Sequence, residues 1–370
     1  GLAGLAGRRL PPPISTAGPA WLGRSAGRVC VVASQECGNV KPRWAMRSAA
    51  VLQGALARAV EQKSLSQVDP TAAPDVAPFP FEKLAVVGAG VMSNVILSRI
   101  ATGTAESGCP EVSIFDVETA QATRMAEAHP KFVAVDASAA ALEGASLIVL
   151  AVKPQNIASV AREVLRAGSV VSQDAVILSV LAGTRSATIT EQLGLPKVVR
   201  AMPNTPCALG MGMTVWMATP HVTAAERSGV TSIFSYMGDS VEVKDENFID
   251  MATALTGSGP AFVYLAMEAM VDAGVQMGFP RATAVKLVQN TFQGTGAYAM
   301  HSEKHLVQLR NDITSPGGTT AEALYTLERG GLRTTLTDAV FAARKKAEDL
   351  GKGTGSLPDS MASGLSDESF

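Results

Sequence analysis

The sequence KLAVVGAGVMSNVILSRI, residues 83–100, predicts a β-strand, a tight glycine turn and an α-helix. Leu84 to Val87 form a short apolar strand, and the apolar residues after the turn recur at helical spacing: Val91, Val95, Ile96 and Ile100. Gly88 permits the turn, and Gly90 lets the backbone approach a pyrophosphate at which the N–H groups of the new helix point. The third glycine of this dinucleotide-binding fingerprint is Ser93 here, so the match alone also fits an ordinary strand-to-helix turn.

Four further segments extend this unit into a sheet: residues 111–115, 146–154 (SLIVLAVKP), 174–183 (DAVILSVLAG) and 197–206 (KVVRAMPNTP). Each contains a Val-, Ile- and Leu-rich run, as expected when helices cover both faces of a parallel sheet. Asp116 follows the first of these segments. An acid there can hydrogen-bond the ribose hydroxyls of NAD and would repel the extra phosphate of NADP. We therefore expect an α/β Rossmann-type doubly wound parallel sheet that binds NADPH or NADH, with Asp116 favouring NADH.

The residues expected to contact the cofactor lie at the carboxyl ends of the strands, where loops can line one crevice. Lys153 could be an ordinary solvated lysine, but its place at a strand end favours a cofactor contact. The expected set from these motifs is Val87, Gly88, Ala89, Gly90, Val91, Met92, Asp116, Ala151, Val152, Lys153, Pro154 and Asn204.

From Asp245 onward the sequence predicts helices only. Apolar helical patterns cover residues 258–274, 281–300 and about 332–350, and Thr319-Thr320 begin another helix that stops at Gly330-Gly331. Apolar helices with so little charge suggest burial against a second subunit. The predicted domains are a leader and linker (1–80), a dinucleotide-binding domain (81–245), a helical dimerisation and substrate domain (246–352) and a disordered tail (353–370).

Composition narrows the function classes. Hydrophobic residues make up 47% of the 370 residues and the net charge is −2, which gives no electrostatic footprint for nucleic acid. No 18-residue apolar run is free of charge, so we expect no membrane span. The cysteines form no CxxC, which argues against a disulfide framework and a zinc site. Residues 1–50 are arginine-rich with Glu36 as their single acid. This bias predicts a plastid or mitochondrial transit peptide or, if Met46 is the true start, a cytoplasmic protein.

The segment DITSPGGTTAEALYTLERGGLRTTLTDAV, residues 312–340, closely resembles the signature of the pyrroline-5-carboxylate reductase family. Supporting stretches are LAVKP (150–154), RAMPNTP (200–206), TGSGPAF (256–262) and GVQMGFPR (274–281). The resemblance covers nearly all of residues 83–350. It implies a Rossmann domain followed by an all-helical dimerisation domain, and homodimers that assemble into larger rings. The implied reaction is hydride transfer from NAD(P)H to 1-pyrroline-5-carboxylate, which gives L-proline.

This resemblance also implies substrate contacts around a helix N-terminus. Gly317, Gly318, Thr319 and Thr320 offer free backbone N–H groups to a carboxylate. In the family, the threonine that matches Thr320 lies near the ring nitrogen, so Thr320 is the expected catalytic residue. From the residues alone, the two threonines could merely cap the helix. The expected substrate-binding residues are Glu303, Asp312, Gly318, Thr319 and Thr320.

Three of the expected site residues either depart from the family's sequence or have an alternative interpretation. Asp312 stands where the family often has a substrate-facing amide, and a carboxylate there would repel the substrate unless protonated or turned away. Ser138 stands where an asparagine often meets the adenosine half of the cofactor, and we include it among the cofactor-binding residues. Glu303 could instead be a solvated charge. It also lies between His301 and His305, but no third nitrogen or sulfur ligand is evident, so we expect no metal.

Two other functions remain open. A hydroxyacid dehydrogenase of similar two-domain plan needs a base, typically a lysine on the first long helix of the second domain, and residues 258–274 contain no Lys or His. A non-catalytic dinucleotide sensor would tolerate loss of SPGGTT, which is intact here. Reduction of an imine needs little acid–base machinery, because the nitrogen can arrive already protonated.

Overall fold

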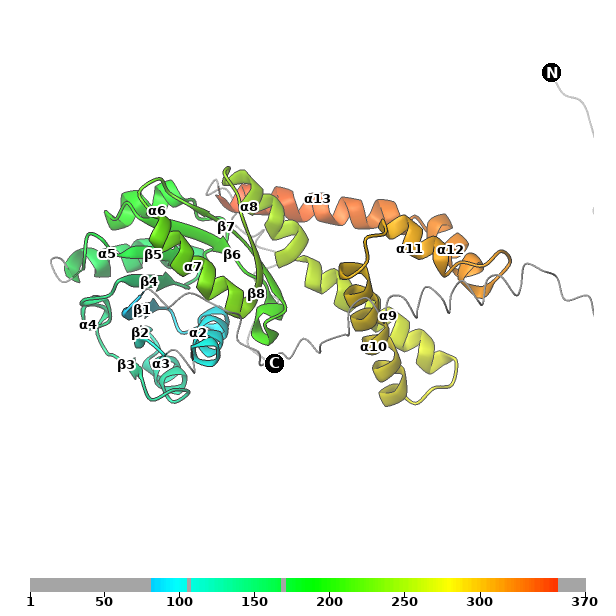
Figure 1. Ribbon diagram of the computed structural model, residues 1–370, viewed down its shortest axis with the longest axis horizontal. Helices are drawn as coiled ribbons and strands as arrows, with labels where there is room; N and C mark the ends of the chain where they lie inside the picture. Colours follow the sequence, from blue (N-terminus) through cyan, green and yellow to red (C-terminus); the bar gives the residue numbers. More distant parts are fainter. Residues whose placement is uncertain (1–80, 105–107, 168–170, 352–370) are drawn as a thin grey trace, which may run out of the picture. The chain divides into compact units, whose positions relative to one another are not determined.

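A computed structural model describes residues 81–104, 108–167 and 171–351 (Figure 1). The predicted leader and linker, the predicted tail, Cys30 and Cys37 lie outside these residues. No helix in the described part of the chain is long and apolar enough to cross a membrane.

The described residues form an eight-stranded sheet in the order β3-β2-β1-β4-β5-β6-β7-β8. The pairs from β3 to β6 are parallel, β6 and β7 are antiparallel, and β7 and β8 are parallel. The strands are β1 (Lys83–Val87), β2 (Glu111–Phe115), β3 (Phe132–Ala134), β4 (Leu147–Leu150), β5 (Val176–Ser179), β6 (Val198–Met202), β7 (Gly212–Ala218) and β8 (Gly238–Glu242). The expected parallel Rossmann-type sheet is thus confirmed.

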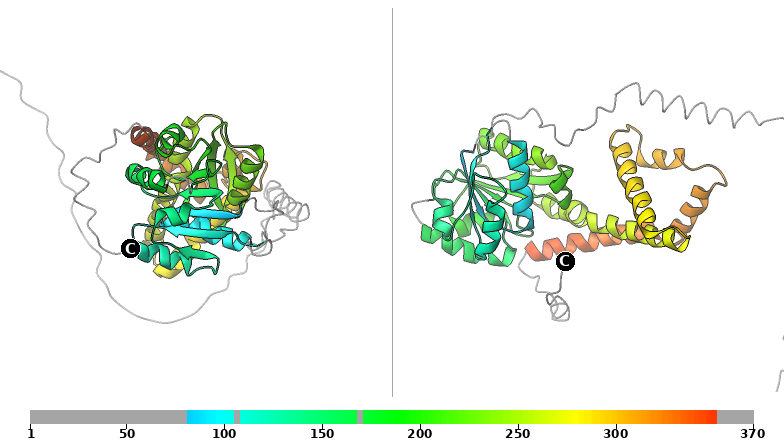
Figure 2. Two further views of the ribbon diagram at one scale, coloured as in Figure 1. Left: turned by 90° about the vertical axis from the view of Figure 1, so that its left-hand side faces the viewer. Right: turned by 90° about the horizontal axis from the view of Figure 1, so that it is seen from below.

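Helices cover both faces of this sheet, as the right-hand view of Figure 2 shows. Successive strand residues point to opposite faces, so Leu84 and Val86 join one core while Ala85 and Val87 join the other. The first core contains residues of α2 (Val91–Gly103), α3 (Thr119–Ala126) and α7 (Ala224–Met237); the second contains residues of α4 (Ser138–Leu142), α5 (Ile157–Ala167) and α6 (Ser186–Leu193). This double burial explains why the central strands are continuous apolar runs.

Strands β3, β7 and β8 are not predicted by the sequence analysis. β3 is only three residues long, and β8, with the sequence GDSVE, lies half-exposed at the sheet edge. β7 follows the left-handed residue Gly210 and pairs with β6 along Val199–Met202. β3 and β8 thus carry little of the apolar signal that marks a buried strand, whereas β7 is an interior apolar strand that the sequence analysis did not identify.

The second half is helical, as expected. Its elements are α8 (Asn247–Ala252), a π-helical turn η4 (Thr253–Gly257), α9 (Gly259–Gln276), α10 (Arg281–Met300), α11 (Leu306–Asp312), α12 (Thr319–Arg329) and α13 (Leu332–Gly351). α9 and α10 pack together through a small core of Val271, Ala284 and Val288. α13 returns to the sheet domain, where it packs on α8 and η4 (Figure 1). The end of α13 lies directly against the loop after β5, because a Cβ added to Gly183 would lie 3.0 Å from Leu350 Cβ.

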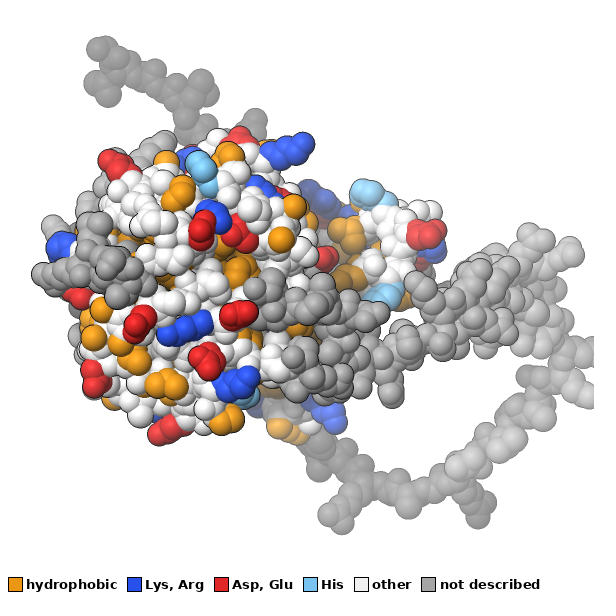
Figure 3. Space-filling model, turned by 60° about the vertical axis from the view of Figure 1, so that its left-hand side comes forward, with side chains coloured by type: hydrophobic (Ala, Val, Ile, Leu, Met, Phe, Trp, Pro, Cys, Tyr) orange, Lys and Arg blue, Asp and Glu red, His pale blue; other side chains and the backbone are white. Residues whose placement is uncertain are grey.

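Surface charge is mixed in sign on the face shown in Figure 3, where acidic and basic side chains are interspersed over the sheet domain. In the helical region, many large apolar side chains are exposed in the single chain. Examples are Leu265 (67%), Met300 (85%) and Phe341 (60%). Apolar area of this extent marks an interaction surface.

Candidate functional site

The glycine turn between β1 and α2 approaches the end of β4 closely. Gly88 has φ 100°, and a Cβ there would lie 2.7 Å from the carbonyl oxygen of Ala151 and 2.8 Å from Val152 Cγ1. Any side chain at Gly88 would therefore clash. A Cβ on Gly90 would meet only the Ala151 oxygen, at 4.0 Å. Space therefore remains beside Gly90 for a diphosphate, as a dinucleotide requires.

The amino end of α2 is free to bind an anion. Its N-cap is Gly90, no side chain caps it, and no acid lies in its first turn. The first N–H groups of a helix have no partner within the helix, and here they include those of Val91 and Met92. The residues present thus fit a bound nicotinamide dinucleotide.

Ser93 replaces the third glycine of the fingerprint without disturbing the turn. It is fully buried, and its hydroxyl donates to the carbonyl oxygen of Gly88. The hydroxyl therefore fastens the first turn of α2 to the glycine loop.

Asp116, at the end of β2, contacts the same loop. Its Oδ2 accepts from the N–H of Ala89 at 2.6 Å, and its Oδ1 accepts from the N–H of Glu118 at 2.8 Å. The structure thus brings Asp116 beside the glycine turn at Ala89. Its expected role toward the ribose stays a prediction.

The other expected cofactor residues differ in how they are held. Lys153 is exposed as the N-cap of a short 3₁₀ turn that begins at Pro154. Asn204 Oδ1 accepts from the N–H of Met213 at 3.0 Å, which ties the end of β6 to β7. Ser138 is buried, and its hydroxyl donates to Glu163 Oε2 at 3.1 Å, toward α5. The roles of these three residues toward a cofactor stay predictions.

The SPGGTT segment forms the expected helix N-terminus. Gly317 has φ 68°, and Gly318 is the N-cap of α12, which begins at Thr319. Neither Thr319 nor Thr320 occupies the N-cap, and neither hydroxyl has a hydrogen-bond partner among the described residues. The interpretation of these threonines as simple caps is therefore wrong. Both hydroxyls and the first N–H groups of α12 are available to a ligand.

Asp312 forms an ion pair that the sequence analysis did not anticipate. Lys304 Nζ lies 2.7 Å from Asp312 Oδ2, with both side chains about half-exposed. The hydrogen bond to Asp312 and its charge raise the pKa of Lys304 above its ordinary value. Asp312 is thus a paired carboxylate rather than an isolated one. The neighbouring Glu303 is exposed and makes no hydrogen bond or ion pair among the described residues.

The two histidines around Glu303 have structural contacts. Nδ1 of His305 accepts from the N–H of Val307 at 3.3 Å as the N-cap of α11, and Nδ1 of His301 lies 2.8 Å from the carbonyl oxygen of Ala297. No group of three metal-ligating side chains occurs among the described residues.

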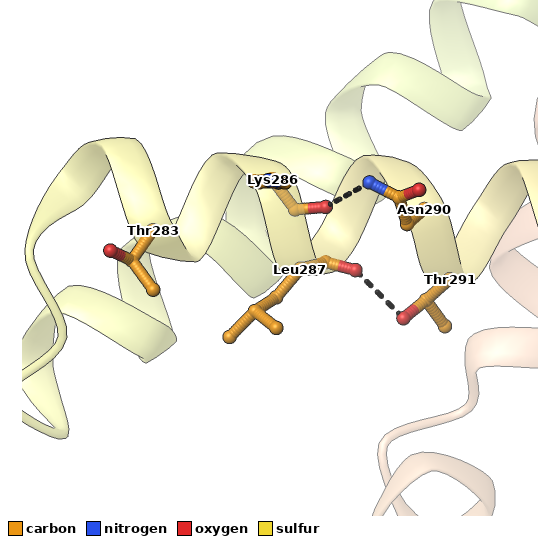
Figure 4. Close-up of a pocket in the computed structure, with 5 residues that line it drawn as sticks. All are labelled: Thr283, Lys286, Leu287, Asn290 and Thr291. Atoms are coloured by element: carbon orange, nitrogen blue, oxygen red, sulfur yellow. Dashed lines mark hydrogen bonds between the residues drawn. The ribbon is translucent and has the colours of Figure 1, made fainter.

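One shallow pocket lies away from these residues, on the outer face of α10 (Figure 4). It is lined by Thr283, Lys286, Leu287, Asn290 and Thr291. Asn290 and Thr291 donate to carbonyl oxygens of their own helix, at 2.8 Å each. We assign this pocket no role.

The candidate residues form two groups within one chain. The cofactor group surrounds the glycine turn, and the substrate group surrounds α11 and α12. No hydrogen bond or ion pair joins them within the described residues, and α12 packs mainly on α13.

Comparison with known proteins addresses both groups. Residues 246–350 match the family model for pyrroline-5-carboxylate reductase dimerisation, and residues 83–183 match that for coenzyme F420-dependent NADP oxidoreductases. The pyrroline-5-carboxylate reductase of Pisum sativum is 35% identical over 72% of this chain and 95% of its own length. The pyrroline-5-carboxylate reductase of Synechocystis is 36% identical over 73% of this chain and 98% of its own length. This chain belongs to the pyrroline-5-carboxylate reductase family.

Solved structures of the family agree. The pyrroline-5-carboxylate reductase of Coxiella burnetii is 31% identical, with a TM-score of 0.65 over 73% of this chain and 98% of that one. The Plasmodium falciparum enzyme, solved with NADP bound, is 29% identical. Its TM-score is 0.64, and the match covers 74% of this chain and 100% of that one. The family predicted from the SPGGTT segment is thus confirmed. So are the reductase function and the use of NAD(P)H.

Proposed function

We propose that this protein reduces 1-pyrroline-5-carboxylate to L-proline with hydride from NADPH or NADH, the last step of proline biosynthesis. The observation that carries the proposal is the uncapped N-terminus of α12, with Thr319 and Thr320 free, in a member of this reductase family. The nicotinamide supplies the hydride, and the protein's residues bind and orient the two reactants.

The chemistry fits these groups. The substrate's carboxylate is attracted to the N–H groups at the start of α12, where the helix dipole is positive. Hydride adds to the imine carbon and the electron pair of the C=N bond moves to the nitrogen, which carries or gains a proton. The Thr320 hydroxyl can donate to or accept from that nitrogen as its charge changes. This requires no strong acid–base pair.

A second subunit completes the proposed site. The exposed apolar side chains of α9 to α13, together with the match to a dimerisation domain, support a homodimer. In such a dimer the substrate group of one chain can approach the cofactor group of its partner. Rings of dimers, as the resemblance implies, are the further assembly that we propose.

We propose NADH as the better cofactor. The carboxylate of Asp116 lies beside the glycine turn, where the extra phosphate of NADPH would meet a negative charge. A hydroxyacid dehydrogenase is the weaker alternative, since α9 contains no Lys or His to serve as its base.

The test is a steady-state assay of purified protein with 1-pyrroline-5-carboxylate and each reduced cofactor in turn. We expect oxidation of the cofactor and stoichiometric appearance of proline. Consumption of neither cofactor with this substrate would overturn the proposal, and turnover of a 2- or 3-hydroxyacid would favour the alternative.

A further inference from the structure

A buried ion-pair network joins the sheet to the first helix of the dimerisation region. Arg200 lies in the middle of β6 and is 1% exposed. Its Nη1 lies 2.9 Å from Glu246 Oε1, and its Nη2 lies 2.7 Å from Asp250 Oδ1. Glu246 and Asp250 lie at the start of α8 and within it, four residues apart, so both carboxylates face one side of that helix.

The same carboxylates bind the segment that follows β5. Asp250 Oδ2 lies 3.4 Å from Nη2 of Arg185, while Glu246 accepts from the N–H of Ser186 at 2.7 Å and from its hydroxyl at 3.2 Å. Two cations thus balance two anions. α8 is thereby fixed to β6 and to the start of α6.

Stability alone does not account for such a network. Removing several charges from water costs free energy that the ion pairs recover only in part. Arg200 Nε also has no hydrogen-bond partner within the described residues. Apolar side chains of similar volume often stabilise a fold as well or better, so a positional role is the more economical explanation.

What the network positions is the π-helical turn η4, which continues directly from α8. A Cβ on Gly257, the last residue of this turn, would lie 3.1 Å from Met202 Cε at the end of β6. Asn204, an expected cofactor residue, follows two residues later. π-helical turns inside α-helices occur frequently at functional sites. α13, which leads back from α12, also packs on η4.

We propose that Arg200 is a positioning residue, which through Glu246 and Asp250 holds α8 and the π turn against β6 and the start of α6. In this position the dimerisation region presents the imine to the nicotinamide at reacting distance. The inference rests on the proposed function, because it concerns the geometry of the same hydride transfer. A misplacement of about 1 Å is enough to slow such a step on the order of 100-fold.

The test compares Arg200→Met with the triple variant Arg200→Met, Glu246→Gln, Asp250→Asn. The single change leaves two buried carboxylates with fewer partners and should lower Tm. The triple change removes those charges and should recover most of the Tm. We expect both to lose kcat on the order of 100-fold and to keep the cofactor Kd within about threefold, because the glycine turn is untouched. Arg200→Lys, which retains the charge, should recover part of kcat.

Lys197→Met is the matched control. Lys197 precedes β6 and also pairs with two carboxylates, Glu226 at 2.8 Å and Asp174 at 3.2 Å, but all three lie within the sheet domain. It should keep its kcat. Recovery of kcat together with Tm in the triple variant would overturn the positioning role, as would equal loss of kcat in Lys197→Met.

Amide hydrogen exchange separates this inference from the proposed function. Residues 247–257 should exchange faster in the Arg200 variants than in the wild type, whereas residues 83–93 should not change. Unchanged exchange at 247–257 would contradict the network's role even if the reductase is active. A wild type that does not reduce 1-pyrroline-5-carboxylate would instead contradict the proposed function.

Discussion

The backbone N–H of Ala89 donates to Asp116 Oδ2 at 2.6 Å, so the acid at the end of β2 holds the glycine turn at the end of β1. β1 and β2 are neighbouring parallel strands whose last residues, Val87 and Phe115, are paired. The residue expected to select the ribose thus also shapes the loop expected to bind the diphosphate. A substitution at Asp116 should therefore affect cofactor choice and cofactor affinity together.

The first prediction concerns that selection. Asp116→Ser should shift the ratio of kcat/KM for NADPH over NADH upward by about tenfold or more, because a unit charge near a phosphate contributes on the order of 1 to 4 kcal/mol in a partly solvated site. The KM for NADH should rise as well, since Ala89 loses its acceptor. Steady-state kinetics with both cofactors measures this ratio.

Glu118→Gln is the control for this experiment. Glu118 is an exposed acid two residues further on, and its side chain accepts from Gln121 rather than from the glycine turn. It should leave the ratio unchanged. A wild type that strongly prefers NADPH would show that Asp116 does not exclude the extra phosphate.

The second prediction concerns Thr320, whose hydroxyl has no partner within the described residues. Thr320→Ala should lower kcat on the order of 100-fold, as loss of one well-placed hydrogen-bonding group in a reacting site does. Cofactor affinity should stay constant, because the cofactor group surrounds the glycine turn. Fluorescence titration with NADH alongside the turnover assay separates the two effects.

Thr320→Ser retains the hydroxyl and should recover most of the turnover. Equal turnover of Thr320→Ala and the wild type would remove Thr320 from the site.

The third prediction addresses Asp312, the departure from the family's sequence. Because Lys304 neutralises this carboxylate, Lys304→Met should raise the KM for pyrroline-5-carboxylate several-fold by exposing the substrate's carboxylate to an unpaired negative charge. The double variant Lys304→Met, Asp312→Asn removes both charges and should restore KM. A double-mutant cycle on KM measures this coupling.

Salt provides an independent check on the same pair. The increase in KM of Lys304→Met should shrink at high ionic strength, since exposed charges are screened. Additive effects of the two substitutions would mean that the ion pair has no influence on the substrate.

The sequence predicts the central sheet well because each inner strand, such as β4, is buried on both faces and reads as a continuous apolar run. It also places the start of α12 at Thr319, since glycine and threonine signal a helix N-terminus. The sequence alone does not identify the ion-pair partners of Arg200. A charged residue within an apolar strand indicates a buried partner, but only the docking of α8 shows which carboxylates provide it.

The same limit applies to β7 and β8, which pair through two glycines. Gly212 lies opposite Gly238, and Gly238 has φ 135°. A Cβ on Gly238 would lie 2.5 Å from the backbone nitrogen of Gly212, and a Cβ on Gly212 would lie 2.7 Å from Cys207 Cα. Gly212 and Gly238 are far apart in the sequence, so their close approach depends on tertiary packing rather than local pattern.

The last prediction follows from this contact. Gly238→Ala should destabilise the fold by about 3 kcal/mol or more, because the new methyl group meets backbone atoms that cannot rotate away and the residue keeps a positive φ. Gly194→Ala is the matched control: Gly194 also has a positive φ, 70°, but no atom lies within 4 Å of its added Cβ. It should cost only about 1 to 2 kcal/mol. Thermal unfolding at one fixed protein concentration compares the two. Equal losses of Tm would show that the β7–β8 contact relaxes freely, and that the positive φ alone requires glycine at position 238.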